Sequence, residues 1–403
     1  MTTWHNWAGN QAAHPALIAQ PASRDELVQL VRSAQAAGHT LRVVGAGHSF
    51  TPLCATGGVL VSLDRMQGLI EADPATHTAC IQAGTRIFQL GPMLRAHDLG
   101  LANQGDIDRQ ALAGAVSTGT HGTGLAYGSF STTVREARLV LASGEIVTCS
   151  EAHEPELFKA AQLGLGALGM LADLTLQLVP AYRLHARSWP APFEVAMGEL
   201  HQQVHANDHF EFFWVPALDT CAMKALNPTE APIQAAHPGA PAAPGTIERY
   251  LVPEHVDWSD RVYPSDRDVR FVEMEFAVPL ADGPACFGAI RDLIQTRHTG
   301  VRWVVEYRTQ RADDVWLSPA YGRDVATISI HEPPDRPYQA FFDDAEAIFR
   351  SFGGRPHWAK LHTHTARDFE RLYPRWNDFL AVRERFDPGG MFLNEHLRGL
   401  FGL

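Results

Sequence analysis

The chain has 403 residues, of which 45% are hydrophobic, and a formal net charge of −12. This length indicates two domains with a large buried core, and the negative charge argues against nucleic acid or an anionic membrane surface as a partner. The first residues, MTTWHNWAGN, lack the regions of a signal peptide, the apolar stretch around 157–181 contains charged residues, and the five cysteines include no CxxC pair, so we expect a cytoplasmic protein with reduced thiols and no membrane span.

The first part of the chain predicts alternating helices and strands. Ser23 and Glu26 form a capping box at the start of a predicted helix that ends at Gly38, and LRVV at 41–44 follows as a buried strand. Three further segments predict two strands and a hairpin with a Ser-Gly turn: 58–63, 77–83 and 134–150.

A further helix is predicted at 85–100, with Thr85 as its N-cap and a kink at Pro92. Residues 163–180 end this first α+β unit, and beyond them strands and helices alternate less regularly. The Ala-, Pro- and Gly-rich segment 229–246 is a predicted surface loop within the second unit.

Two glycine-rich loops are candidates for binding a phosphate group. RVVGAGHSFTP at 42–52 lacks the dinucleotide fingerprint, because Phe50 takes the place of the third glycine and Pro52 would interrupt a helix. The backbone N–H groups of such a turn can still point at an anion, and STGTHGTG at 117–124 supplies a second loop with several hydroxyl groups. The alternative is two tight turns at the rim of a sheet.

His48 ends the first glycine loop. Its imidazole either forms an ordinary hydrogen bond to the backbone or acts as a nucleophile that attacks the 8α-methyl group of a flavin. A histidine beside a diphosphate-binding loop would lie close to such a cofactor, so both interpretations remain open at this point.

Several motifs give the chain a family resemblance. They are HNWAGN (5–10), VVGAGHSF (43–50), STGTHGTG (117–124), GALG (166–169), EYR (306–308), WLSPAYGRD (316–324), GGRPHWAKLH (353–362) and DPGGMFLN (387–394). From about residue 4 to 401, the chain resembles the sugar-lactone and alditol oxidases of the vanillyl-alcohol-oxidase flavoprotein superfamily. The resemblance implies an α+β fold, with a two-part FAD-binding domain (1–180 and the returning segment 366–403) and an inserted α+β cap domain over the flavin (181–365).

The resemblance also implies FAD as the cofactor, bound covalently through His48. The residues that it places around FAD are Val44, Gly45, Ala46, Gly47, His48, Ser49, Gly105, Asp106, Gly114, Ser117, Thr118, Gly119, Thr120, His121, Gly124, Gly169 and Leu171.

The same resemblance bears on the substrate. GGRPHWAK is closer to gulono-, galactono- and arabinono-1,4-lactone oxidases, whereas alditol oxidases tend to carry a histidine where Ser329 aligns. Gly105 is typical of oxidases, since an alanine at the matching place goes with poor oxygen access in the plant lactone dehydrogenase. Asp106 is less expected than Ser or Ala, and its carboxylate would repel an acidic substrate.

Two pairs of residues two positions apart lie in strand-like runs, and each pair therefore shares one face of its strand. The pair of Glu306 and Arg308 is either a surface ion pair or a site in which the carboxylate binds substrate hydroxyls and the guanidinium lies near the substrate oxygen or the flavin. In the pair of Ser329 and His331, the histidine is a base, a hydrogen-bonding partner of a substrate hydroxyl, or a half-buried strand residue without such a role.

Lys360 is one of only three lysines, the others being Lys159 and Lys224. In a chain that otherwise uses arginine, a compact ammonium group is suggestive of a specific role. The resemblance places Lys360 by the N1–C2 carbonyl edge of the flavin or by the substrate.

The predicted reaction transfers hydride from a carbohydrate C–H(OH) to flavin N5, and O₂ then reoxidises the flavin and forms H₂O₂. The predicted substrate is an aldono-1,4-lactone of the L-gulono, L-galactono or D-arabinono type, with an alditol such as xylitol or sorbitol as the alternative. A metal-dependent lactonase built on His331, His357, His362 and His364 is disfavoured because no carboxylate ligand lies nearby in the sequence. The oligomeric state is not predicted.

Overall fold

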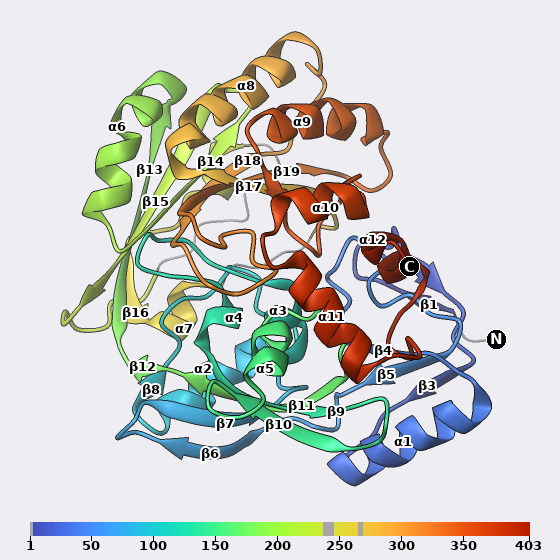
Figure 1. Ribbon diagram of the computed structural model, residues 1–403. Helices are drawn as coiled ribbons and strands as arrows, with labels where there is room; N and C mark the ends of the chain where they lie inside the picture. The colour runs from blue at the N-terminus through green and yellow to red at the C-terminus, as the bar shows by residue number, and fades with distance from the viewer. Residues whose placement is uncertain (1–2, 237–245, 265–268) are drawn as a thin grey trace.

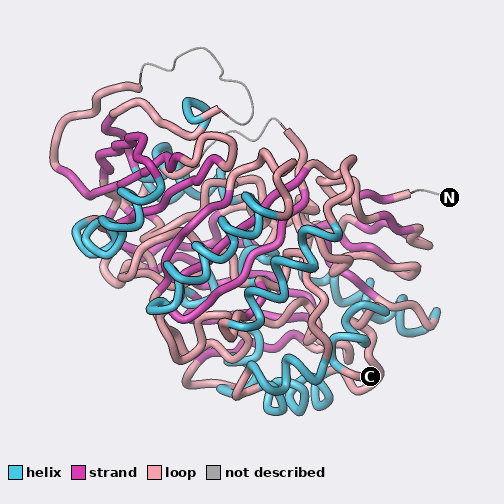
Figure 2. Tube along the Cα trace, turned by 90° about the horizontal axis from the view of Figure 1, so that it is seen from above, coloured by secondary structure: helices cyan, strands magenta, loops and turns pink. Residues whose placement is uncertain are grey.

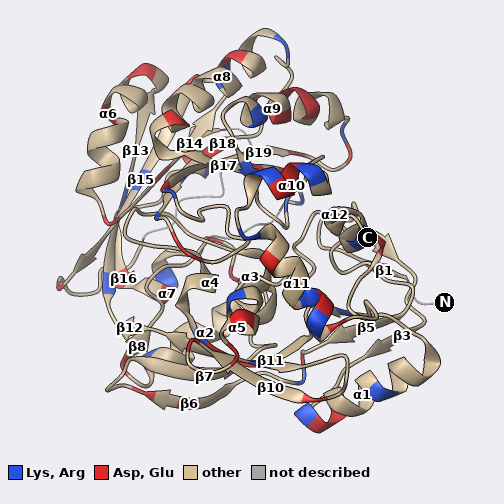
Figure 3. Ribbon diagram, in the orientation of Figure 1, with Lys and Arg blue, Asp and Glu red and all other residues tan. Residues whose placement is uncertain are grey.

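The computed structural model describes residues 3–236, 246–264 and 269–403. It is a mixed α and β structure with two regions, the lower one formed largely by the first part of the chain and the upper one built on a large sheet (Figure 1). Among the described residues, every helix is too short or too polar to span a lipid bilayer. In Figure 3 basic and acidic residues are interspersed along helices α1 (Arg24–Ala37), α10 (Ala366–Leu372) and α11 (Trp376–Phe386).

The first helix and strand of the lower region form as the sequence predicts. Helix α1 begins after Ser23, whose side chain accepts the N–H of Glu26, and ends at Gly38, which has a left-handed backbone. The helix leads into a parallel three-stranded sheet of order β3-β5-β4, with strands β3 (Leu17–Ala19), β4 (Leu41–Val44) and β5 (Val59–Ser62).

A second sheet of the lower region has five antiparallel strands in the order β10-β9-β11-β7-β6. Its strands are β6 (Leu69–Asp73), β7 (Thr78–Gln82), β9 (Val134–Val140), β10 (Ile146–Ser150) and β11 (Met170–Gln177). Strands β9 and β10 pair directly, which confirms the predicted hairpin. The shorter elements of this region are β1 (Trp4–His5), β2 (Ala12–Ala13), β8 (Leu99–Gly100), β12 (Val179–Pro180), α3 (Leu112–Thr118), α4 (Phe130–Thr133) and α5 (Pro155–Ala161).

The helix predicted at 85–100 is shorter than expected, and the prediction that Thr85 caps it is wrong. Helix α2 spans Ile87–Arg95, and its N-cap is Arg86. The Thr85 hydroxyl instead donates to the carbonyl of Gln82 and accepts the N–H of Gly68, so it closes the turn after β7 and is not available as a cap.

The upper region is an antiparallel sheet of eight strands in the order β16-β13-β15-β14-β18-β19-β17-β20. Its strands are β13 (Arg183–Pro192), β14 (His209–Val215), β15 (Thr220–Thr229), β16 (His255–Trp258), β17 (Val272–Pro279), β18 (Val305–Gln310), β19 (Val325–Glu332) and β20 (Arg355–Pro356). Helices α6 (Phe193–Ala206), α8 (Gly283–Thr296) and α9 (Gln339–Ser351) lie together on one face of it, and Figure 2 shows this arrangement from above. The other elements here are η1 (Ile247–Arg249), α7 (Ser259–Val262) and η2 (Leu280–Asp282).

The predicted loop 229–246 starts at the last residue of β15, and its residues 237–245 lie outside the described part of the chain. After the large sheet, helices α10, α11 and α12 (Glu395–Phe401) return to the lower region, where α11 packs against α5. The large apolar side chains of this segment, including Phe369, Trp376 and Phe379, belong to the core of the lower region.

The domain boundaries at residues 180 and 365 stay predictions, and the packing shows one exception to a simple division there. Trp358 and the run Val315, Trp316 and Leu317 come from the predicted cap range, yet they pack in the core of the lower region.

Arg42 on β4 stabilises the lower region through hydrogen bonds to distant parts of the chain. Its buried guanidinium donates to the carbonyls of Leu53 (2.8 Å), Leu165 (2.8 Å), Gly166 (2.9 Å) and Phe392 (2.5 Å).

Candidate active site

One large pocket contains nearly all the residues that the sequence predicts for the site. All predicted cofactor residues except Gly119 and Gly124 line it, and so do the four predicted catalytic residues, Glu306, Arg308, His331 and Lys360. Its empty space, including the open mouth, is about 1900 Å³. It is lined both by the glycine loops of the lower region and by strands of the large sheet.

Gly119 and Gly124 do not line the pocket, and each instead allows a backbone conformation that favours glycine. Gly119 is the left-handed C-cap of α3, and an added Cβ would lie 2.9 Å from the side chain of Leu163. Gly124 donates its N–H to the carbonyl of Thr309 on β18 at 2.9 Å, and its φ of +125° favours glycine.

The first glycine loop is held in shape by the HNWAGN motif. The N–H of Trp7 donates to the carbonyl of Gly47 at 2.8 Å, and the side-chain amide of Asn6 donates to the carbonyl of Ser49 at 2.9 Å. Gly45 has no room for a side chain, because a Cβ would lie 2.9 Å from that of Ala111. The motif therefore fixes the loop that follows β4.

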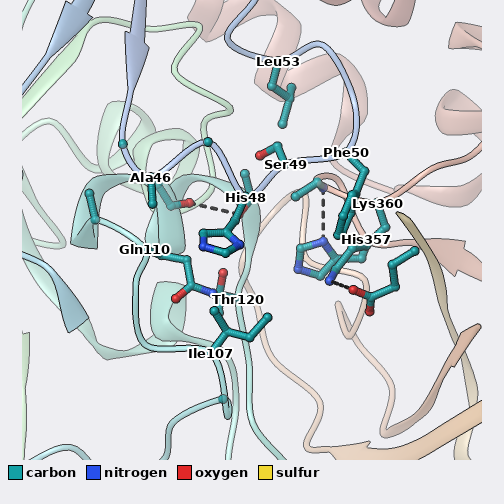
Figure 4. Close-up of a pocket in the computed structure, with 18 of the residues that line it drawn as sticks. Ala46, His48, Ser49, Phe50, Leu53, Ile107, Gln110, Thr120, His357 and Lys360 are labelled. Atoms are coloured by element: carbon teal, nitrogen blue, oxygen red, sulfur yellow. Dashed lines mark hydrogen bonds and ion pairs between the residues drawn. The ribbon is translucent and has the colours of Figure 1, made fainter. Parts of the chain in front are cut away.

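His48 lies inside the pocket (Figure 4). Its ring stacks on Trp7 with 4.8 Å between the ring centroids. Burial lowers the pKa of His48 to about 4, and the positive charges of Lys360, Arg86 and Arg109 act in the same direction. At neutral pH the imidazole is therefore uncharged and keeps a lone pair on one nitrogen.

The second glycine loop is joined to the large sheet. The Thr123 hydroxyl donates to the carbonyl of Phe210 on β14 at 2.5 Å. His121 lies between two acceptors, with Nδ1 2.8 Å from the carbonyl of Gly122 and Nε2 2.7 Å from Oε1 of Glu275 on β17. Because both neighbours are acceptor oxygens, each ring nitrogen of His121 is placed to donate a hydrogen bond.

Three neighbouring strands of the large sheet present polar side chains to the pocket. Glu306 on β18 lies opposite Ser329 on β19, and Ser329 lies opposite Glu275 on β17. His331 and Glu273 form the next pair of the same two strands. The prediction that Glu306 shares a face with Arg308, and Ser329 with His331, rests on this alternation along the strands, and the side chains of all four are buried.

Arg308 is surrounded by carboxylates. It donates to Asp106 and to Glu211 on β14, both at 2.7 Å, and lies 2.5 Å from Glu306. Glu211 is also paired at 2.8 Å with the buried Lys224 on β15. The expectation that Asp106 repels an acidic substrate therefore needs correction, because the guanidinium offsets its charge.

Burial favours the protonated form of the Glu306 carboxyl and raises its pKa well above the usual glutamate range. The carboxylates of Asp106, Glu211 and Glu273 act in the same direction, whereas the neighbouring Arg308 opposes the shift. The side chain can therefore both donate and accept a hydrogen bond.

Lys360 occupies the opposite end of this polar face. Its ammonium group is ion-paired with Glu273 and lies 5.1 Å from the ring centroid of Phe50. Glu273 also lies 3.7 Å from Nε2 of His331, whose Nδ1 donates to the carbonyl of Val304 at 3.1 Å. Of the other two lysines, Lys159 is ion-paired with Asp314 near the surface, whereas Lys224 is buried and ion-paired with Glu211.

Four pocket or network residues were not anticipated as part of the site: Glu211, Lys224, Glu273 and Glu275. Glu273 and Glu275 were detectable, because they are two positions apart in the strand FVEMEFAVP just as Glu306 and Arg308 are in EYR. Glu211 and Lys224 become neighbours only when strands β14 and β15 pair, so the sequence alone does not indicate that they belong together.

The four histidines of the alternative metal site do not converge. His364 bonds to Glu346 on α9 at 2.9 Å, His362 has both ring nitrogens buried without a hydrogen-bond partner, and His331 bonds to Val304. Of the four, in the part of the chain that the structure describes, only His357 belongs to a group of three potential ligands within 4.8 Å of one another, and the other two are His121 and Glu275. The four histidines of this alternative, which the sequence already disfavours, therefore do not form one cluster.

Models of two protein families match the chain. The model described as D-arabinono-1,4-lactone oxidase matches residues 174–252 and 245–400, and the model described as FAD binding domain matches residues 15–150. The chain belongs to the D-arabinono-1,4-lactone oxidase family. The match of the second model to the glycine loops agrees with their place in the pocket and identifies FAD as the cofactor.

Several relatives of the family match over nearly their whole length. An L-gulono-1,4-lactone dehydrogenase of Mycobacterium tuberculosis is 34% identical, with 99% of each chain covered. An L-gulonolactone oxidase of Scyliorhinus torazame is 30% identical over 99% of this chain and 98% of its own. A D-arabinono-1,4-lactone oxidase of Yarrowia lipolytica is 27% identical over 96% and 95%.

Solved structures share the fold. Cholesterol oxidase from Brevibacterium sterolicum superposes with a TM-score of 0.86 at 18% identity, covering 99% of this chain and 96% of its own. 6-Hydroxy-D-nicotine oxidase from Arthrobacter nicotinovorans gives 0.73 at 19% identity, covering 96% and 93%. The predicted fold, an FAD-binding domain of the vanillyl-alcohol-oxidase type with an α+β cap, is thereby confirmed.

Proposed function

We propose that the protein is an FAD-dependent oxidase that takes hydride from a C–H(OH) group of an aldono-1,4-lactone and reduces O₂ to H₂O₂. The observation that carries the proposal is that one pocket joins the FAD loops of the lower region to a face of buried acids and bases on the large sheet. The family and its relatives suggest lactones of the L-gulono and D-arabinono types, and the resemblance carried by GGRPHWAK adds the L-galactono type.

The residues around the pocket fit the cofactor. The backbone N–H groups of the two glycine loops are suited to a diphosphate group. At Gly45 there is no room for a side chain. His48 is an uncharged nucleophile at the wall, and we propose that it carries FAD covalently. When bound, FAD supplies the hydride acceptor and the group that O₂ reoxidises.

We propose that the polar face binds and orients the lactone. Arg308 and Lys360 place positive charge where the reacting oxygen becomes negative, and the Glu306 carboxyl hydrogen-bonds substrate hydroxyls. His331 hydrogen-bonds a substrate hydroxyl from the neighbouring strand. These residues exchange no covalent bond with the substrate.

The balance of charges supports a neutral substrate. Arg308 is paired with Asp106, Lys360 with Glu273, His121 with Glu275 and Lys224 with Glu211. Since each of these basic groups already has a carboxylate, none of them offers an unmatched positive charge to an aldonate. A lactone, which has no charge, is therefore favoured over the open-chain acid.

An alditol is the less favoured substrate. Ser329 stands where alditol oxidases tend to carry a histidine, and its hydroxyl donates to Glu275 at 2.9 Å. We also propose O₂ as the electron acceptor, which Gly105 in the pocket lining supports, and a cytoplasmic location, which the five unpaired cysteines support.

The test is reduction of the flavin in purified protein. We expect anaerobic bleaching of its absorbance by L-gulono-, L-galactono- or D-arabinono-1,4-lactone, slower or no bleaching by xylitol and sorbitol, and none by the aldonates. On admission of air, we expect O₂ uptake with an equal amount of H₂O₂. Reduction by an alditol alone, or reoxidation only by an artificial acceptor, would refute the substrate or the oxidase assignment, respectively.

A further inference from the structure

His357 is a buried residue of the pocket that the proposed reaction has not yet used. It follows strand β20, and its side chain is 5% exposed and lines the pocket beside Lys360 (Figure 4). Its backbone N–H donates to the carbonyl of Glu275 on β17 at 3.0 Å. The ring is thus attached to the same sheet that carries the polar face.

The hydrogen bonds of His357 define the position of its ring proton. Nδ1 accepts the backbone N–H of Ala359 at 3.1 Å. A ring nitrogen that accepts an N–H carries no proton in the neutral form, so the proton lies on Nε2. Within the described part of the chain, Nε2 has no hydrogen-bond partner.

The surroundings keep this ring uncharged. Burial lowers the pKa of His357 to about 4; Glu275 and Glu273 oppose this shift, whereas Lys360 and His121 add to it. The ring of His121 lies 5.9 Å away, centroid to centroid. His357 is therefore a permanent Nε2–H donor at neutral pH.

Two other roles are incompatible with this arrangement. A general base needs a free lone pair, and the Nδ1 lone pair of His357 is used by Ala359. A metal site of His121, Glu275 and His357 would need unprotonated nitrogens, but both nitrogens of His121 are placed to donate and His357 carries the proton on Nε2. What remains is hydrogen-bond donation to whatever fills the pocket.

We propose that His357 is a further catalytic residue, whose Nε2–H donates a hydrogen bond to an oxygen atom of the lactone. The proposal rests on the proposed function. The substrate is favoured over FAD as the acceptor because His357 belongs to the sheet of Glu273, Glu275 and Lys360, whereas the FAD-binding model matches residues 15–150.

Two substitutions of His357 distinguish donation from packing. In His357→Gln the side-chain amide reaches the place of Nε2 and keeps a donor there, whereas in His357→Asn the shorter amide falls near Nδ1. His362→Asn is the matched control, because this neighbouring histidine has buried ring nitrogens and does not line the pocket. Flavin content and thermal midpoint are measured for all three variants.

The main readout is the Kd of a 2-deoxy-lactone, an analogue that lacks the reacting hydroxyl. Its binding at equilibrium is measured by the change in flavin absorbance. Loss of one hydrogen bond to a neutral oxygen predicts a Kd about three- to tenfold higher in His357→Asn. We expect most of this affinity to return in His357→Gln and no change in His362→Asn.

Several results would overturn the proposal. One is wild-type affinity for the analogue in His357→Asn. Another is a shift of the flavin spectrum and potential in the ligand-free variant with unchanged lactone binding, which would assign the donor to FAD. If His357→Asn does not fold, the ¹⁵N spectrum of histidine-labelled wild-type protein decides, because a proton on Nδ1 of His357 excludes the donor. Failure of every lactone to reduce the wild-type flavin would instead refute the proposed function.

Discussion

His48 combines two properties of a residue that can bond to a flavin: it lies in the FAD pocket, and it is uncharged with a pKa lowered to about 4. We predict that His48→Ala still binds FAD but releases it when the protein is precipitated in acid, whereas the wild-type pellet retains flavin fluorescence. His153→Ala, at an exposed position, serves as the control. Flavin in the wild-type supernatant would contradict covalent attachment.

Asp106 adds a third carboxylate to the surroundings of Arg308, and its charge helps to raise the pKa of Glu306. A group whose folded-state pKa is raised binds more protons in the folded than in the unfolded protein, so it lowers stability as pH rises between the two values. One such proton contributes a slope of about −1.4 kcal/mol per pH unit. In Asp106→Asn the pKa of Glu306 should be raised less, so the loss of folding stability with rising pH should end at a lower pH than in the wild type.

The measurement for Asp106→Asn is the free energy of unfolding in urea at a series of pH values above the usual glutamate range. The slope is the informative quantity, because the lost hydrogen bond to Arg308 shifts all values of the variant together. Parallel curves for the wild type and Asp106→Asn would show that Asp106 does not control the protonation of Glu306.

Gly105 tests the choice of electron acceptor. A Cβ at this position would lie 2.9 Å from the carbonyl oxygen of His121, so an alanine must displace the second glycine loop by a few tenths of an ångström. We expect Gly105→Ala to slow reoxidation by O₂ while reduction by lactone and reoxidation by an artificial acceptor are kept. Gly198→Ala is the control, since a Cβ there meets nothing within 4 Å and the residue lies on helix α6, outside the pocket lining. Equal losses with both acceptors would argue against an effect on O₂.

At the scale of elements, helix α9 supports the segment that carries His357 and Lys360. The buried carboxylate of Glu346 accepts the N–H and hydroxyl of Thr363 and bonds to Nδ1 of His364. We predict that Glu346→Ala lowers the free energy of unfolding by about 2–4 kcal/mol, because these buried donors lose their acceptor. Glu370→Ala, on the exposed face of α10, should change it by less than about 0.5 kcal/mol. Urea unfolding compares the two variants.

The period of two along β18 was sufficient to predict that Glu306 and Arg308 share a face. The same period in β17 holds Glu273 and Glu275, but their partners, Lys360 and His121, come from other parts of the chain. A strand pattern gives the face of a residue, whereas its ion-pair partner depends on the tertiary fold. The helix start at Thr85 was mispredicted for a similar reason, since the hydroxyl bonds to Gly68 and not to the helix.

Over the whole molecule, the order of the glycine loops and the late HWAK motif allowed the fold and the cofactor to be predicted from the sequence. The contacts that join the two regions could not be predicted in this way. His121 and Glu275 are 154 positions apart, and Arg308 and Asp106 are 202 apart. The place of Trp358 in the lower core likewise follows from packing alone.

Arg42 is the residue with the largest predicted effect on the whole molecule. Its replacement leaves buried carbonyls of three chain segments without their donor. We predict that Arg42→Met lowers the free energy of unfolding by about 3–5 kcal/mol and also weakens FAD retention, because Arg42 lines the pocket. Arg32→Met, at an exposed position of α1, should be close to wild type. Urea unfolding and flavin content are the measurements.

The bond from Arg42 to the carbonyl of Phe392 joins positions 350 apart in the chain. A ribosome that adds roughly 5–20 residues per second needs about 20–70 s to make the residues between them. During that time the first glycine loop has been synthesised but lacks the C-terminal segment that completes its surroundings. We therefore expect the flavin to be loaded only after the C-terminal segment has been synthesised and has folded onto the first glycine loop.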